Sequence, residues 1–88
     1  MALLGADVEA LRNLATRLSA GSNEIQNQKN QLNNMLDGVD WRGPDGDAFR
    51  NDWRSNHLPA LDRIATALEE AGRQATRNAQ QQEDTSRG

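Results

Sequence analysis

The side chains that could carry out chemistry in this chain are few and poorly grouped. The single histidine, His57, has Asp52 and Asp62 five residues away on either side. Neither spacing is the three or four residues that makes neighbours on an α-helix. The chain has no cysteine, which excludes a thiol nucleophile and a cysteine metal site. No Ser-His-Asp set, phosphate-binding loop or H-x-x-x-H pair is present. We therefore predict a protein that is not an enzyme and needs no cofactor or metal.

Acidic residues gather near the middle of the chain and raise the question of a calcium site. They are Asp37, Asp40, Asp45 and Asp47. Asp45-Gly46-Asp47 lacks the rest of a twelve-residue calcium loop and its terminal glutamate. Helix capping is the simpler explanation, because a carboxylate of Asp45 or Asp47 can accept the free amides at the start of a helix.

The same stretch holds most of the residues that form turns. Gly43, Pro44 and Gly46 lie close together, and such a density of glycine and proline ends one helix and begins another. We predict a turn at about residues 38–45, with Gly38 as the residue that ends the first helix. Trp41 in this turn has two interpretations. It closes the end of a two-helix core, or Trp41 and Gly43 form part of a recognition surface.

Apolar residues recur every seven positions before this turn. The repeat is Leu4, Leu11, Leu18, Ile25, Leu32 and Val39, with Leu14 among the residues that fill the intervening positions. It predicts a helix at about residues 7–37, about 45 Å long, with an apolar seam of the coiled-coil kind. Between Ser19 and Gln31 polar residues, Lys29 among them, interrupt the seam. They form a solvated face, or a polar patch that sets the register or binds a partner.

A second helix is expected at about residues 46–79. Its seam contains Phe49, Trp53, Leu61, Ile64 and Leu68. Pro59 predicts a kink, because proline has no amide hydrogen to donate to the carbonyl of Ser55. The two seams align as an antiparallel hairpin with Leu68 opposite Leu18. The last residues, 80–88, contain no large apolar side chain, so we expect a flexible tail.

Length and composition indicate how such a hairpin is completed. Eighty-eight residues make one small domain, and only 35% of them are apolar, too few to cover two long helices without a partner. We expect an all-α fold in which two hairpins pair into a four-helix bundle dimer. The net charge is −3 and the arginines are scattered, which argues against nucleic-acid binding. No apolar run is long enough to span a membrane, and the N-terminus is unlike a classical signal peptide.

A central Trp41-Arg42-Gly43 turn between two long helices, followed by Phe49, resembles the WXG100 (ESAT-6-like) family. The resemblance covers essentially the whole chain. It implies a helical hairpin that pairs with itself or with a related protein. It also implies export, without a signal peptide, by the type VII (ESX) secretion system of actinobacteria and other Gram-positive bacteria, which uses an FtsK/SpoIIIE-like ATPase.

The C-terminus departs from the family pattern. Members carry a Tyr-x-x-x-Asp/Glu element after the second helix that contributes to the export signal. This chain has no tyrosine, and the best match in spacing places Gln80 at the tyrosine position and Asp84 at the acidic one. The resemblance therefore implies one of two roles. In the first, the protein is secreted, either through a degenerate signal of its own or through a partner that carries the tyrosine. In the second, it is a non-secreted adaptor. Such an adaptor would pair with the helical N-terminal domain of a larger type VII toxin.

Overall fold

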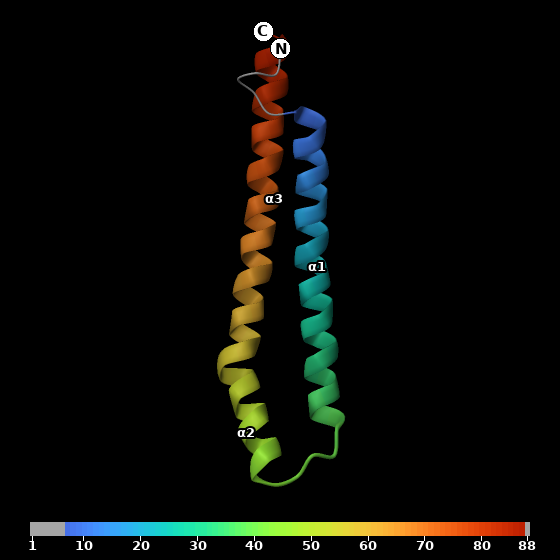
Figure 1. Cartoon of the computed structure of the whole chain (residues 1–88), viewed down its shortest axis with the longest axis vertical. Helices are drawn as coiled ribbons and strands as arrows, with labels where there is room; N and C mark the ends of the chain where they lie inside the picture. Colours follow the sequence, from blue (N-terminus) through green and yellow to red (C-terminus); the bar gives the residue numbers. More distant parts are fainter. Residues whose placement is uncertain (1–6, 88) are drawn as a thin grey trace.

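The structure, a computed structural model, describes residues 7–87 and consists of two antiparallel helical arms joined by one short turn. The first arm is α1 (Val8–Gly38). The second arm runs without a break through α2 (Pro44–Asp52), the π-helical turn η1 (Trp53–His57) and α3 (Leu58–Arg87). Figure 1 shows the two arms side by side along their length. The predicted all-α antiparallel hairpin is confirmed, and residues 7–87 contain no strand. Leu4, the first residue of the heptad series, lies outside the described residues.

The first helix begins as the sequence suggests but ends without the expected glycine geometry. The Asp7 side chain accepts a hydrogen bond from the Ala10 amide at 3.2 Å, which makes it the N-cap. At the other end Gly38 is still helical, and Val39 takes an extended conformation while its amide bonds the Met35 carbonyl at 2.9 Å. Among the described glycines, only Gly43 has a positive φ. Gly38 therefore does not provide the left-handed C-cap that was predicted.

The contact between the two arms is built from small residues. Ala15 and Ser22 on α1 and Ala65 on α3 are buried, with exposed fractions of 8%, 5% and 1%. A Cβ placed on Gly72 would lie 3.3 Å from the Ala15 carbonyl oxygen, so the backbones approach closely there. Large side chains contribute to this contact mainly from its edge, and the core inside one hairpin is thin.

Leu68 lies about one helical turn from the partner predicted for it, while other pairs, such as Ser22 with Ala65, lie close to the predicted register. Leu68 lies against Gly21, with its Cδ1 atom 3.5 Å from where a Gly21 Cβ would be, and not simply opposite Leu18. Leu18 lies against Gly72, with its Cβ atom 3.6 Å from where a Gly72 Cβ would be. A large residue on one helix thus meets glycine on the other, which is what lets the helices interdigitate at a short distance.

Two of the polar residues that interrupt the seam form bonds between the arms. The Ser22 hydroxyl donates to the Ala65 carbonyl at 2.7 Å in a buried position. The Lys29 ammonium pairs with Asp62 at 2.5 Å, and the Lys29 side chain is only 16% exposed. These contacts favour the interpretation of the interruption as a patch that fixes the register.

The irregularity expected at Pro59 takes the form of a π-helical turn just before it. In η1 the Leu58 amide bonds the Trp53 carbonyl five residues back, so the turn holds one extra residue. Ala65 is twelve positions after Trp53. In a regular helix, at about 100° per residue, these two would point about 120° apart. Counting one residue less reduces the difference to about 20°, and both side chains then face α1.

The tail predicted to be flexible is instead helical, since α3 continues to Arg87. Ala79, at the expected end of the helix, is fully buried. Beyond it, Arg12 on α1 pairs with Glu83 at 2.6 Å and also reaches the Gln80 side chain at 3.3 Å. Contacts between polar side chains thus hold the last turns on α1, although no large apolar residue is present to do so.

Candidate functional site: the Trp41 turn and the apolar face

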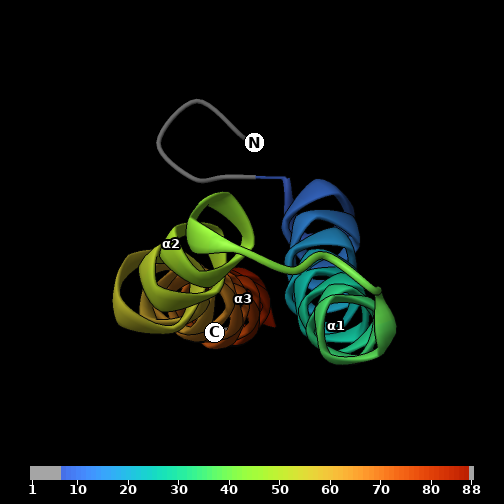
Figure 2. The ribbon, with the colours of Figure 1, turned by 90° about the horizontal axis from the view of Figure 1, so that it is seen from below.

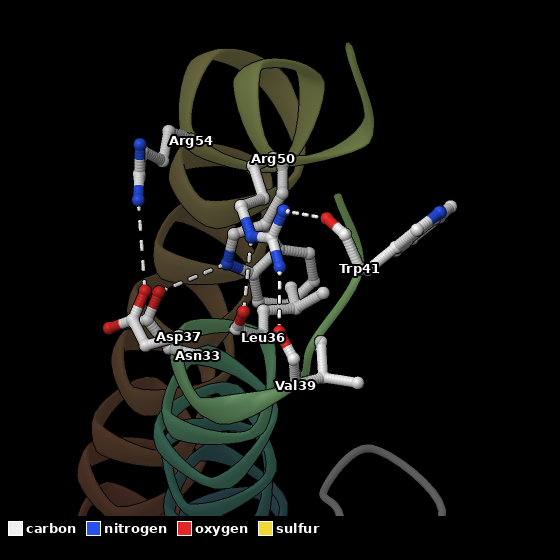
Figure 3. A network of polar contacts seen from close by, with 8 residues as sticks. Asn33, Leu36, Asp37, Val39, Trp41, Arg50 and Arg54 are labelled. Carbon is white, nitrogen blue, oxygen red and sulfur yellow. Dashed lines mark hydrogen bonds and ion pairs between the residues drawn. The ribbon is translucent and has the colours of Figure 1, made fainter. Parts of the chain in front are cut away.

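The turn between the arms places Trp41 at the surface of the closed end of the hairpin. Its side chain is 38% exposed, and Figure 3 shows it pointing away from the helices. Its ring lies against that of Phe49 on α2, with centroids 5.3 Å apart. The role of closing the core at this end falls to Trp53, which is 8% exposed. Its indole nitrogen donates to the Asn33 side chain at 3.1 Å.

Two glycines give the turn its shape for different reasons. Gly43 has φ 101° and ψ −179°, a conformation that is essentially restricted to glycine. Gly46 lies directly against Trp41, since a Cβ there would come within 2.4 Å of the Trp41 carbonyl oxygen. The Trp-x-Gly motif therefore has a physical basis in Gly43, and Gly46 is a second required glycine that the motif does not include.

The start of α2 differs from the prediction that an aspartate caps it. Gly43 is the N-cap and Pro44 the first helical residue, with no hydrogen bond from a capping side chain. The Asp47 amide bonds the Gly43 carbonyl at 3.1 Å. Asp45 and Asp47 lie in the first turn, where their negative charge favours the helix N-terminus without a hydrogen bond.

Arg50, a residue that the sequence analysis did not single out, holds the turn together. Its guanidinium donates to the carbonyls of Leu36, Val39 and Trp41 at 3.1, 3.0 and 2.8 Å (Figure 3). Leu36 belongs to the last turn of α1, where carbonyls have no partner within the helix. No periodicity or motif marks such a residue, because its partners are backbone atoms.

The predicted seam residues divide into two groups in the structure. Half-buried along the hairpin contact are Leu11, Leu18, Ile25, Leu61 and Leu68. More exposed are Leu14 at 50%, Leu32 at 41%, Phe49 at 41% and Ile64 at 49%. Trp53 alone among them is buried.

These large residues share one face of the hairpin. At about 100° per residue, Leu14, Leu18 and Leu32 lie about 60–100° to one side of the line through Ala15 and Ser22. On α3, Leu68 and Ile64 lie about 60–100° from Ala65 in the same rotational sense. Because the helices are antiparallel, the same sense on both helices corresponds to one common face. We call it the apolar face, made up of Leu14, Leu18, Ile25, Leu32, Leu61, Ile64 and Leu68.

The opposite face carries a polar groove between α1 and α3. The groove has a volume of about 940 Å³, and its lining includes Ala15, Ser19 and Gly72. Three arginines stand at its rim, and each has an acceptor: Arg12 bonds Glu83, Arg73 bonds Glu69 and Arg77 bonds Gln74. The two faces of the hairpin thus differ in their side chains: large aliphatic residues lie on one, and arginines with their acceptors stand along the groove on the other.

The single histidine has a carboxylate partner after all. The His57 Nε2 atom lies 2.9 Å from Asp52, because a π-helical turn makes neighbours of residues five apart. A hydrogen bond from Asn56 has the largest effect and lowers the pKa of Asp52. Desolvation opposes it, and the charge and hydrogen bond of His57 each lower the pKa by a smaller amount. Both side chains are about half exposed, and neither lies in a cleft with a nucleophile.

Neither a metal site nor a membrane-spanning element is found in the part of the chain that the structure describes. No three acidic, histidine or cysteine side chains between residues 7 and 87 group as ligands. Of the central aspartates, Asp40 pairs with Arg42 at 2.7 Å and Asp37 with Arg54 at 3.7 Å. Over the same residues no helix is apolar and long enough to cross a bilayer.

The residues at the expected C-terminal element lie on α3 near the start of α1. Gln80 donates to Asp84 at 3.0 Å along the helix, and Arg12 donates to Gln80. They are at the end of the hairpin opposite Trp41, as Figure 1 shows for the two regions of chain. Within one hairpin, the Trp41 turn and Gln80 therefore cannot form a joint surface.

The comparisons with known proteins agree with this architecture. The chain belongs to the WXG100 family, described as proteins of 100 residues with WXG, whose model matches residues 4–86. No curated protein and no solved structure matches the chain. The Trp41-Arg42-Gly43 turn supplies the three letters of the family name, and the match includes both arms.

Proposed function

We propose that this chain is a small non-enzymatic protein that a type VII (ESX) secretion system exports as a dimer. WXG100 proteins are small helical proteins without enzymatic activity, and many are type VII substrates. The observation that carries the proposal is the apolar face. Leu14, Leu32 and Ile64 are each 41–50% exposed on a hairpin whose internal contact consists mostly of alanine, glycine and serine.

The apolar face supports pairing because of its composition and place. Burying a leucine or isoleucine side chain is worth about 1.5–3 kcal/mol, and single exposed apolar residues are common but a continuous face is not. A second hairpin packed on this face would complete a four-helix bundle. That hairpin would be another copy of this chain or a related WXG100 protein. The polar groove on the other face would remain in water.

In this proposal Trp41 and Gly43 form the part that the secretion ATPase, of the FtsK/SpoIIIE type, reads. The exposure of Trp41 and its contact with Phe49 support a recognition role. Export would proceed from the cytoplasm without a classical signal peptide. Gln80 and Asp84 would act as a degenerate signal next to the partner's turn, because antiparallel pairing of two hairpins brings the open end of one beside the closed end of the other.

A second function is favoured by one specific observation, the absence of tyrosine. With Gln80 at the position of the family's tyrosine, the chain could serve as a non-secreted adaptor that pairs with the helical N-terminal domain of a larger type VII toxin. The same apolar face would be used, covered by the toxin's helices.

The experiment that tests these functions is a secretion assay with the tagged protein in its native host. We expect it in the culture supernatant of the wild type and only in the lysate of a strain that lacks the secretion ATPase. Trp41→Phe should yield a dimer that melts at a similar temperature but stays in the lysate. Wild-type protein found in lysate only, bound to a larger protein, would support the adaptor function and contradict export. A folded Trp41→Phe dimer exported normally would show that Trp41 is not read.

A further inference from the structure

Arg50 donates hydrogen bonds to the turn as well as to the C-terminal end of α1. Its three donors reach three carbonyls that belong to three different parts of the chain. Leu36 lies in the last turn of α1, Val39 is the C-cap that follows it, and Trp41 is the exposed aromatic residue of the turn. The Val39 carbonyl also accepts the Trp41 amide at 3.1 Å. One side chain from α2 thus fixes both the end of α1 and the backbone of Trp41.

We propose that Arg50 is the positioning residue of the Trp41 turn. By holding the Trp41 carbonyl, its guanidinium sets the direction in which the indole leaves the turn. The inference concerns the orientation of Trp41, and it rests on the proposed function only for its consequence in export.

The geometry of the hydrogen bond from Arg50 to the Trp41 carbonyl explains how it orients Trp41. The Trp41 carbonyl accepts from the Arg50 guanidinium at 2.8 Å and also lies against Gly46, where a Cβ would come within 2.4 Å of its oxygen. The same Cβ would come within 3.0 Å of the Trp41 Cγ, so the base of the side chain lies against Gly46 too. With the backbone and the base of the side chain located in this way, the indole lies against the Phe49 ring, and Figure 3 shows it directed outward.

Arginine suits this task better than lysine. The guanidinium is planar and presents its N–H groups in fixed directions, so three separate carbonyls can be served at once. A lysine ammonium is a compact charge that rotates on a flexible stem. Lysine would keep the positive charge near the C-terminal end of α1 but not the arrangement of three bonds.

A neighbouring arginine provides a matched control. Arg54 lies four residues further along the same arm and pairs with Asp37 at 3.7 Å, with both side chains 60% exposed. It reaches from the second arm to the end of α1, as Arg50 does, but no bond joins it to the turn backbone. Arg54→Gln therefore removes a charge at the same end of the hairpin and leaves the three carbonyls in place.

The test uses the full chain labelled with 5-fluorotryptophan, whose two fluorine resonances report Trp41 and Trp53 separately. Trp41→Phe assigns them. In Arg50→Gln and Arg50→Lys we expect the Trp41 resonance to shift and broaden while the Trp53 resonance keeps its place, with the helical content unchanged. Arg54→Gln should move neither. If Arg50→Gln fails to fold, Arg50→Lys, which keeps the charge, decides the question.

The two levels of the proposal are separated by the export measurement. A Trp41 resonance that is unchanged in folded Arg50→Gln and Arg50→Lys would overturn the positioning role, whatever happens to secretion. If the Trp41 resonance is displaced but Trp41→Phe is still exported, Arg50 remains a positioning residue. The proposal that the secretion ATPase recognises Trp41 is then refuted. A displaced resonance together with lost export, in a variant that is still dimeric, is the result that we expect.

Discussion

The indole nitrogen of Trp53 donates a hydrogen bond to the side-chain oxygen of Asn33, across 3.1 Å and between residues twenty positions apart. It joins η1 to α1 next to the closed end of the hairpin. Among the residues that the structure describes, Trp53 is the one large side chain that is buried, at 8% exposure, and a buried indole needs a partner for its N–H group. In Figure 2, a view from that end, the two arms lie next to each other with the turn crossing between them.

This relationship predicts the effect of removing the acceptor. Asn33→Ala leaves the Trp53 N–H without its partner in a nearly buried position, which should cost about 1–3 kcal/mol in the free energy of unfolding. Asn34→Ala, at an exposed position next to it, should change that free energy by less than about 0.5 kcal/mol. Urea denaturation followed by circular dichroism measures both. Equal values for the two variants would show that the bond contributes nothing.

The π-helical turn predicts an unusual tolerance to a one-residue deletion. Removing Asn56 takes the extra residue out of η1, so that a regular helix would still point Trp53 and Ala65 to the same side. With Pro59→Ala in addition, to supply the missing amide, we expect a folded, helical protein. Removing Glu70 from α3 instead rotates everything after it by about 100° and should abolish cooperative unfolding.

Thermal melts of the two deletion variants make this comparison direct. The Asn56 deletion with Pro59→Ala should melt cooperatively, and the Glu70 deletion should not. The opposite ranking would mean that the rotation of α3 relative to α2 about the helix axis does not affect the stability of the hairpin.

Much of the fold could be predicted from the sequence because it depends on patterns that extend over many residues. The heptads that contain Leu11, Leu18 and Ile25 indicate a long helix, and the glycines and Pro44 indicate where it reverses. The π-helical turn could not be predicted, because Pro59 shows only that the regular ladder fails and not which irregularity replaces it. The His57–Asp52 pair followed from that turn and was missed for the same reason.

The details of the site were less visible in the sequence. The seam residues were identified by type, but whether Leu14 packs inside one hairpin or faces outward depends on how closely Ala15, Ser22 and Gly72 let the helices approach. Arg50 bonds only to backbone carbonyls, so no residue pattern marks it. The helical C-terminus depends on Arg12, which is 68 and 71 residues away from its partners Gln80 and Glu83.

The glycines of the turn give predictions of opposite sign. Gly43→Ala forces alanine into a conformation with φ 101° and should cost about 1–3 kcal/mol. Gly46→Ala places a methyl group against the Trp41 carbonyl and should also destabilise. Gly38→Ala is the control, because it is helical with nothing within 4 Å of the new Cβ, and should be neutral or stabilise by up to about 1 kcal/mol. Chemical denaturation ranks the three, and a stabilising Gly43→Ala would contradict the structure of the turn.

The pH dependence of stability should contain a contribution from Asp52. The hydrogen bond from Asn56, followed by the charge and hydrogen bond of His57, lowers the pKa of Asp52 in the folded protein. The unfolded chain then binds a proton more readily, so the stabilisation is complete above the ordinary aspartate pKa of about 3.9 and is lost as the pH falls below it. Melting temperatures between pH 2 and 6 should fall less steeply for Asp52→Asn, and for Asn56→Ala, than for the wild type. Parallel curves for all three would refute this assignment.

The apolar face gives the prediction that bears most directly on function. Ile64→Asp places a charge on this face without changing the Ala65 contact inside the hairpin. It should prevent two hairpins from pairing, while the helices of each hairpin still form. Ala67→Asp adds the same charge on the exposed outer side of α3 and should leave the dimer intact. Sedimentation at micromolar concentration should give a wild-type dimer, a dimer for Ala67→Asp and a monomer for Ile64→Asp.

Truncation on the same face tests burial and not charge. Leu18→Ala and Leu68→Ala remove side chains that one hairpin buries only in part and that a paired hairpin would cover fully. In the dimer each should therefore cost about 2–5 kcal/mol, the range for a buried leucine. The cost should depend on protein concentration, because unfolding is then coupled to dissociation.

A stable, cooperatively folded wild-type monomer, with either truncation costing less than about 0.5 kcal/mol, would show that the apolar face pairs with nothing. A wild-type monomer that is poorly folded alone but becomes helical when mixed with a related hairpin would instead identify a heterodimer.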